Sequence, residues 1–332
     1  MNKLLLIDGN NLFHRAYHAI PHLTNKEGEA TNAVFGFSNM LIKAVDEVSP
    51  RFIACAFDTQ APTFRHIEFE KYKAQRVAPP PDLYPQLPKV KKVLDAYGIK
   101  YFEKEGFEAD DLLATLAVKS LQTTDYRLQK KKKAVDSRQL TVVILSGDRD
   151  VLQLVDGNIK VQMPGWNQNE TTLYGAREVK EKYGLEPHQM VDYKSLTGDP
   201  SDNVPGISGV GPKTASALLQ KYHTLENLFK KLKEVPEPLK SKLELGKEIA
   251  LAAKKLIELD RNVAIGIKLS ELRFDPDWEK VRREFEELGF RSIAAKIPNG
   301  SQLTVDSSQK KKKKSVNREP KTDNKSNQLE LI

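Results

Sequence analysis

Three continuous apolar segments, each closely followed by an aspartate, constrain the fold of this chain most. They are residues 4–7, 52–57 and 141–145, and the acids are Asp8, Asp58 and Asp148. Uninterrupted apolar and β-branched runs indicate strands that are buried on both faces, and the amphipathic stretches between them indicate covering helices. The sequence therefore predicts an α/β fold with a mostly parallel central sheet flanked by helices.

Further acids stand where they could join those three, because the carboxyl ends of parallel strands meet at one edge of a sheet. The additional candidates are Glu108, Asp110, Asp111, Asp150, Asp199 and Asp202. Glu108 and Asp111 are three residues apart and share one face of a helix. Two plainer interpretations stay open. An aspartate at a strand end is a common helix N-cap, and acids in a first helical turn are stabilised by the helix dipole.

So many carboxylates at one place require cations. Without them, mutual repulsion would cost several kcal/mol and raise the pKa values of the acids. Divalent metal ions resolve the repulsion. Ligation by carboxylates alone, without Cys or His, favours Mg²⁺ or Mn²⁺ over zinc.

Basic and aromatic residues follow the second strand. Arg65, Lys73 and Arg76 lie between two groups of candidate ligands, with Phe64 and Tyr72 beside them. Such a mixture indicates phosphate contacts next to a metal site. The alternative is a solvated helix face.

A glycine-rich segment opens a later helical stretch. Its candidate DNA-binding residues are Gly206, Gly209, Gly211, Lys213 and Thr214. Glycines allow close approach of the backbone, and successive N–H groups at a helix N-terminus form an anion site suited to a phosphodiester. The segment is typical of a helix-hairpin-helix, and the alternative is a glycine hairpin that serves packing only.

Charge and composition bound the remaining possibilities. The net charge of +8 is carried by two segments, since residues 300–332 hold eight Lys/Arg and four acids and residues 125–138 hold six and two. Residues 121–139 are expected to form a polar surface loop, and residues 300–327 to be disordered. No apolar run approaches the roughly 18 residues that a membrane span needs. A single cysteine, Cys55, predicts a reduced cytoplasmic protein.

Taken together, the chain resembles the 5′-nuclease (flap endonuclease) superfamily, and most closely the 5′→3′ exonuclease domain of bacterial DNA polymerase I, over about residues 1–298. The motifs that carry the resemblance are Ile7-Asp8-Gly9, Ala56-Phe57-Asp58, Phe107-Glu108-Ala109-Asp110-Asp111, Ser146-Gly147-Asp148-Arg149-Asp150 and Gly198-Asp199-Pro200-Ser201-Asp202-Asn203-Val204-Pro205-Gly206.

The resemblance implies a PIN-like nuclease core that binds two or more Mg²⁺ (or Mn²⁺) ions. One metal centre would be ringed by Asp8, Asp58, Glu108, Asp110 and Asp111. A second would be completed by Asp148, Asp150, Asp199 and Asp202. Lys73 and Arg76 would act in catalysis by holding the scissile phosphate. Arg65 would contact DNA, and Phe35 would stack on a terminal base.

The same resemblance implies the partners and the domains. The substrates would be DNA with 5′ flaps, nicks or 5′ ends and RNA–DNA primer junctions, cleaved by a monomer in the bacterial cytoplasm at the nucleoid. A K⁺ ion is expected at the helix-hairpin-helix. The core would span residues 1–188, with a helical gateway at about 58–88, and a helical DNA-binding region would span residues 189–298.

The last part of the chain departs from the family pattern. The chain ends where a fused polymerase would begin, which predicts a stand-alone nuclease. Residues 299–332 form a Lys-rich tail, which we interpret as a nonspecific electrostatic tether, a nuclear signal being the alternative. Its last five residues, Gln328, Leu329, Glu330, Leu331 and Ile332, are similar to peptides that bind the bacterial sliding clamp.

Two other functions compete with this interpretation. The first is a metal-dependent ribonuclease with a related acidic α/β core, against which the glycine hairpin argues. The second is a structure-specific DNA binder without catalysis. The full set of acids argues against it, because carboxylates that face a polyanion weaken binding.

Overall fold

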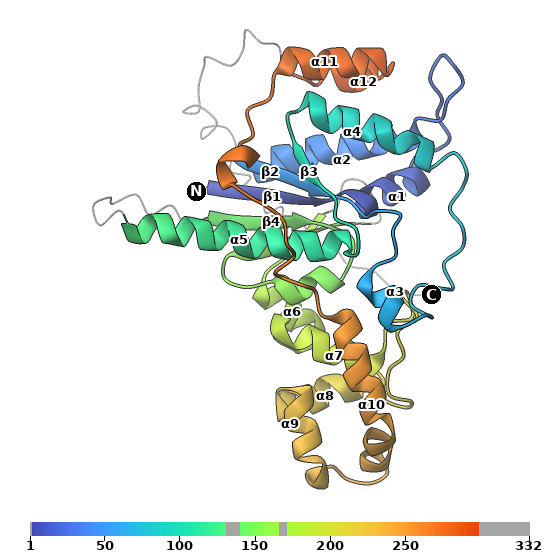
Figure 1. Ribbon diagram of the computed structural model, residues 1–332, viewed down its shortest axis with the longest axis vertical. Coiled ribbons are helices and arrows are strands. Elements are labelled where there is room, and N and C mark those ends of the chain that lie inside the picture. The colour runs from blue at the N-terminus through green and yellow to red at the C-terminus, as the bar shows by residue number, and fades with distance from the viewer. Residues whose placement is uncertain (1, 131–139, 166–170, 299–332) are drawn as a thin grey trace, which may run out of the picture. The chain divides into compact units, whose positions relative to one another are not determined.

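The computed structural model describes residues 2–130, 140–165 and 171–298 (Figure 1). Residues 2–297 belong to one compact unit. In these ranges no helix combines the length and the apolar character that crossing a membrane requires. The tail beyond residue 298, with its candidate clamp-binding peptide, lies outside the described residues.

A six-stranded sheet has the order β3-β2-β1-β4-β5-β6, and only the β5–β6 pair is antiparallel. This confirms the predicted mostly parallel sheet. The three strands predicted from apolar runs are the adjacent strands β2, β1 and β4. The strands are β1 (Asn2–Asp8), β2 (Phe52–Ala56), β3 (Lys100–Phe102), β4 (Leu140–Leu145), β5 (Ile159–Pro164) and β6 (Thr171–Tyr174).

Helices cover both faces of the sheet, which explains why its central strands are apolar throughout. Leu5 and Ile7 of β1 pack into one hydrophobic cluster with α1 (Gly9–Ala19), α2 (Asn32–Val48) and α4 (Leu87–Ala96). Leu4 and Leu6 of the same strand pack into another cluster with α5 (Ala109–Lys130), on the opposite face (Figure 1). The alternation of side chains along a strand thus supplies both cores.

The remaining elements are helices of 4 to 19 residues and short 3₁₀ turns. A third cluster of buried side chains holds α7 to α10 together and forms the predicted C-terminal helical region. Helix α8 begins at Pro212, where a proline costs no intrahelical hydrogen bond. The elements are α3 (Phe64–Glu68), α6 (Ala176–Tyr183), α7 (Met190–Thr197), α8 (Pro212–Tyr222), α9 (Leu225–Lys230), α10 (Leu239–Ile257), α11 (Trp278–Glu287), α12 (Arg291–Ala294), and the 3₁₀ turns Tyr84–Gln86, Asp150–Leu154, Pro187–Gln189, Leu232–Glu234 and Leu269–Leu272.

Two details differ from the sequence prediction. The loop expected at residues 121–139 is helical as far as Lys130, because α5 continues without a glycine or proline beyond the apolar positions that pack on the sheet. Residues 131–139 lie outside the described part. Strands β3, β5 and β6 were not predicted. Strands β3 and β6 have three and four residues, too few for a clear pattern, whereas β5 has six.

Candidate active site

The acids at or just after the ends of strands β1, β2 and β4 lie at one edge of the sheet, because the parallel register aligns the ends of these strands. Asp8 pairs with Ala56 of β2, and Ile7 pairs with Leu145 of β4, so the three strands end side by side. Asp8 is also the N-cap of α1: its carboxylate accepts hydrogen bonds from Asn11 N at 3.0 Å and Ser146 Oγ at 2.6 Å. The capping interpretation is therefore correct for Asp8, without excluding a second role.

A cavity of about 900 Å³ lies at this edge of the sheet. Five of the predicted acids line it together with both predicted catalytic cations, Lys73 and Arg76. The acids are Asp8, Asp58, Glu108, Asp110 and Asp148.

A second group of acids comes from a 3₁₀ turn and a tight loop. Asp150, Asp199 and Asp202 each bring one carboxylate oxygen within 4.8 Å of the other two. Gly198 and Gly206 close the loop by direct backbone contact: a Cβ on Gly206 would lie 2.3 Å from Gly198 N. Gly206, predicted to bind DNA, therefore serves the geometry of this acidic loop.

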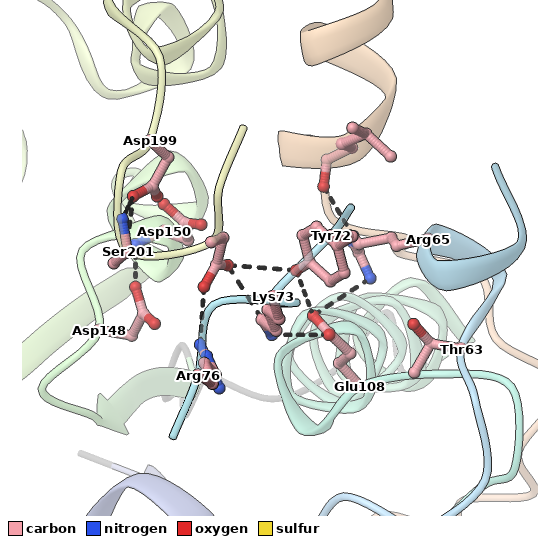
Figure 2. A network of polar contacts seen from close by, with 12 residues as sticks. Thr63, Arg65, Tyr72, Lys73, Arg76, Glu108, Asp148, Asp150, Asp199 and Ser201 are labelled. Atoms are coloured by element: carbon pink, nitrogen blue, oxygen red, sulfur yellow. Dashed lines mark hydrogen bonds and ion pairs between the residues drawn. The ribbon is translucent and has the colours of Figure 1, made fainter. Parts of the chain in front are cut away.

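Cations and a phenol join the two groups of acids (Figure 2). Lys73 Nζ lies 2.6 Å from Glu108 Oε1 and 3.8 Å from Asp202 Oδ2, and Arg76 Nη2 lies 2.6 Å from Asp202 Oδ1. The hydroxyl of Tyr72 lies 3.0 Å from Glu108 Oε2 and 3.1 Å from Asp202 Oδ2. The acids thus approach one another because positive and polar groups stand between them.

Lys73 has a left-handed backbone with a φ of 54°. This conformation is uncommon for a residue other than glycine and costs about 1 kcal/mol or more. Its own N–H donates to the carbonyl oxygen of Asp202 at 3.0 Å, which fixes the turn against the acidic loop. The surrounding contacts thus compensate for the strain.

Arg65 and Asp111 differ from the prediction, because they bind each other in the interior. Their guanidinium and carboxylate form two hydrogen bonds of 2.7 and 2.9 Å. Asp111 also accepts from Glu108 N and Asp260 N and is 0% exposed, so it has no oxygen available to a metal ion. Arg65 is 1% exposed and cannot contact DNA. Both residues are structural.

Phe35 packs against the edge of the core. Its half-buried ring lies edge-on against Phe290, with the ring centroids 5.2 Å apart. The stacking of this ring on a DNA base stays a prediction.

The pKa shifts of Asp8 and Asp110, and a buried oxygen of Asp110, show whether the site fits a metal ion. Burial raises the pKa of Asp8 to about 7, and the neighbouring charges of Asp58 and Asp148 act in the same direction. Burial raises the pKa of Asp110 well above its ordinary value, with like charges adding to the effect. The Oδ1 atom of Asp110 is buried and has no hydrogen-bond partner among the described residues. Oxygen ligands and excess negative charge fit a divalent ion such as Mg²⁺ or Mn²⁺, whose binding would displace protons.

The glycine hairpin lies ahead of α8 in the helical region. Gly209 has a φ of +76°, which favours glycine, and a Cβ placed there would lie 2.8 Å from Lys242 Nζ of α10. Gly211, Lys213 and Gly209 are exposed, and Thr214 is half-buried. The surface at the hairpin therefore offers exposed backbone amides and two ammonium groups. One ammonium belongs to Lys213, and the other to Lys242, which is remote in sequence but adjacent in space.

Several residues of the site were not predicted. His14 and Arg15 line the cavity from α1, and Tyr84 lines it beside His14, whose ring nitrogen Nε2 lies 3.3 Å from the Tyr84 hydroxyl. Their signal was the helical spacing of polar residues after Asp8, which places Asn11, His14 and Arg15 on one face. Lys194 of α7 was not predicted either, because no motif around it indicates a site residue.

Comparisons with known proteins identify the family. The model of the 5′-3′ exonuclease N-terminal, resolvase-like domain matches residues 3–184, and that of the 5′-3′ exonuclease C-terminal SAM fold matches residues 185–280. The chain belongs to the 5′-3′ exonuclease family. This confirms the resemblance drawn from the motifs and agrees with a C-terminal helical domain of the SAM type.

Curated relatives include two DNA polymerases I. That of Caldicellulosiruptor bescii is 37% identical over 299 residues, and that of Bacillus caldotenax is 39% identical over 301 residues. These matches cover 89% and 90% of this chain but 33% of each relative, so the chain spans about a third of their length.

Solved structures share the fold. T5 5′-exonuclease with bound zinc ions has a TM-score of 0.59 at 18% identity, covering 89% of this chain and 96% of that one. The catalytic core of Rad2 in complex with DNA substrate has a TM-score of 0.56 at 16% identity, covering 89% and 92%.

The buried ion pair yields a stability prediction. Replacing Arg65 by alanine leaves Asp111 charged and buried, so we expect the free energy of unfolding to fall by about 3–5 kcal/mol. Arg65→Lys should rescue little, since an ammonium cannot donate two parallel hydrogen bonds. Urea denaturation measures both. The control Arg177→Ala, at a side chain 79% exposed, should change stability by less than about 0.5 kcal/mol. Equal stability of Arg65→Ala and wild type would contradict this role.

Proposed function

We propose that this protein is a metal-dependent nuclease that removes nucleotides from DNA 5′ ends and cuts 5′ flaps, including RNA primers, in replication and repair. The observation that carries the proposal is the convergence of two carboxylate groups on Lys73 and Arg76, in a chain of the 5′-3′ exonuclease family. We also propose the division into a core at residues 1–188 with a gateway at about 58–88, and a DNA-binding region at 189–298.

Divalent ions bound here would supply Lewis-acid polarisation of the scissile phosphodiester and a bound water of lowered pKa. The acids lining the cavity would hold them at the carboxyl ends of β1, β2 and β4. Asp150, Asp199 and Asp202 would hold a second ion. Two ions, Mg²⁺ or Mn²⁺, suit this donor set.

The residues of the chain would position the substrate. Lys73 and Arg76 lie at the cavity and would exchange their carboxylate partners for the oxygens of the scissile phosphate, offsetting its charge. The wall formed by His14 and Tyr84 would bound the path of the strand. The hairpin at Gly209, Gly211 and Lys213 would hold the duplex backbone through its amides, with a K⁺ ion as a further candidate ligand.

Flap cleavage tests the activity. With a 5′-labelled flap duplex and Mg²⁺, we expect metal-dependent cutting near the junction that EDTA abolishes. Asp148→Asn keeps the shape of the side chain but removes a charge, and should lower the cleavage rate at least about a hundred-fold with flap binding retained. Asp275→Asn, at a side chain 81% exposed, is the matched control. Faster cutting of single-stranded RNA would favour the ribonuclease, and flap binding without cutting would favour the DNA binder.

The hairpin has a separate test in the salt dependence of binding. Lys213→Ala and Lys242→Ala should each weaken flap binding and reduce the slope of log K against log[salt] by about 1, since each removes one phosphate contact. Lys233→Ala, an exposed lysine of the same helical region, should leave the slope unchanged. Fluorescence anisotropy measures all three. Equal slopes for wild type, Lys213→Ala and Lys242→Ala would reject the hairpin as the duplex contact.

We further propose that the C-terminal peptide docks on a bacterial sliding clamp while the chain itself acts as a monomer at the nucleoid. The sequence Gln-Leu-Glu-Leu-Ile at residues 328–332 supports this, because short apolar peptides on a polar linker suit groove binding. Deleting residues 328–332 should weaken clamp binding at least about ten-fold by surface plasmon resonance, with clamp-free flap cleavage unchanged. A scrambled peptide of equal composition is the control; if it binds the clamp as well as wild type, docking is nonspecific.

A further inference from the structure

Lys194 of α7 stands inside the second group of acids. Its ammonium donates to Asp199 Oδ2 at 2.7 Å and also to Asp150 Oδ1. The side chain is 16% exposed, so water screens these contacts only in part. Helix α7 fixes its position, because Gly198 N closes the helix on the carbonyl oxygen of Lys194 at 2.7 Å.

Protein groups already satisfy the acids of this group. Lys194 contacts Asp150 and Asp199, and Ser201 donates its N–H and hydroxyl to Asp199 Oδ1 at 3.0 and 2.6 Å. Arg76 contacts Asp202 Oδ1. The electrostatics agree, because burial tends to raise the pKa of Asp199 but the Lys194 ammonium and Ser201 outweigh it and lower that pKa.

Asp110 differs in this respect from the acids around Lys194. Asp110 Oδ1 is buried without a hydrogen-bond partner among the described residues. A divalent ion that binds beside Asp110 contacts an oxygen that is buried from water and has no hydrogen bond to break. An ion entering between Asp150 and Asp199 meets oxygens that an ammonium already binds, and the two positive charges repel each other at this short range.

We propose that Lys194 is the resident counter-ion of the Asp150–Asp199–Asp202 site, and that it competes with the divalent ion there. It holds the acids together while the metal is absent. As a result, this site fills at a higher metal concentration than the site around Asp8 and Asp110. The proposal rests on the proposed nuclease function and adds an order in which the two sites fill.

The surroundings give the displaced side chain somewhere to go. A cavity of about 470 Å³ borders Lys194 and is lined also by Asp148, Arg149 and Tyr193. A lysine suits such a movement, because its charge is compact and its four-carbon stem is flexible. The ammonium can therefore leave Asp150 and Asp199 and remain at the edge of the site.

Metal binding without DNA provides the test. Mn²⁺ is titrated into the full chain, and the free ion is measured by electron paramagnetic resonance. In wild type we expect a tighter and a weaker class of site. Lys194→Met removes the charge at nearly equal length, and should tighten the weaker class about ten-fold or more, leaving the tighter class within about two-fold. Lys194→Arg keeps the charge and should leave the weaker class weak.

Matched controls separate local competition from net charge. Lys180→Met makes the same charge change at an exposed residue paired with Glu186, and should leave both classes unchanged. Asp150→Asn removes a ligand and should abolish the weaker class, which assigns it to this site. Thermal unfolding verifies that each variant is folded, and Lys194→Gln, which keeps a hydrogen-bond donor without the charge, replaces the methionine variant if that one does not fold.

The outcomes are distinct. A weaker class that keeps or loses affinity in Lys194→Met would overturn the counter-ion role and leave the nuclease proposal standing. A wild-type protein that binds no Mn²⁺ would instead reject the metal-dependent function itself. Tightening in Lys194→Met, together with an unchanged Lys180→Met control, would establish the competition.

Discussion

The buried pair of Arg65 and Asp111 connects three parts of the chain on which the site depends. Arg65 belongs to α3, Asp111 to the first turn of α5, and the Arg65 guanidinium also donates to the carbonyl oxygens of Leu256 and Glu258 at the end of α10. Taking two charges out of water is costly, and here two hydrogen bonds within the pair and four to neighbouring backbone groups compensate. Because Glu108 and Asp110 precede Asp111 by three residues and by one, and Glu108 N donates to Asp111, this pair also helps to place those two candidate ligands.

Charge compensation by the protein itself explains how the remaining acids coexist. Lys73 and Arg76 bind Glu108 and Asp202 across the site, and Lys194 binds Asp150 and Asp199. A metal ion that binds one of these carboxylates would have to displace its lysine or arginine. A phosphate that binds Lys73 or Arg76 would have to displace a carboxylate. In the proposed function, binding of substrate and metal would therefore be an exchange of ions. Such an exchange costs less than gathering bare carboxylates, but it lowers the apparent affinity for the phosphate and for the metal ion.

The sequence allowed the sheet and most of the acids to be predicted, because continuous apolar runs and strand-end aspartates are local signals. It could not separate Asp110 from Asp111. Adjacent residues on a helix point about 100° apart, so one faces the cavity and the other faces Arg65, and only the packing of α3 decides which. The pairing of Arg65 with Asp111 and that of Lys194 with Asp150 could not be predicted for the same reason, since the partners lie 46 and 44 residues apart in the chain. For Phe35 the sequence could not show the contact with Phe290, because an aromatic ring that packs on the core and one that stacks on a base look alike in sequence.

Hydrogen bonds join residues 71–76 to the acidic loop at residues 199–203, and this couples the two halves of the proposed reaction. Gln75 donates to the carbonyl oxygens of Pro200 and Ser201, and Asn203 donates to that of Lys71. In the proposed mechanism, a phosphate that draws Arg76 away from Asp202 also frees an oxygen of that acid for a metal ion. A metal ion bound at Asp202 in turn frees Arg76 for the phosphate. Each ligand then tightens the binding of the other by the same factor, since linkage between two sites is reciprocal.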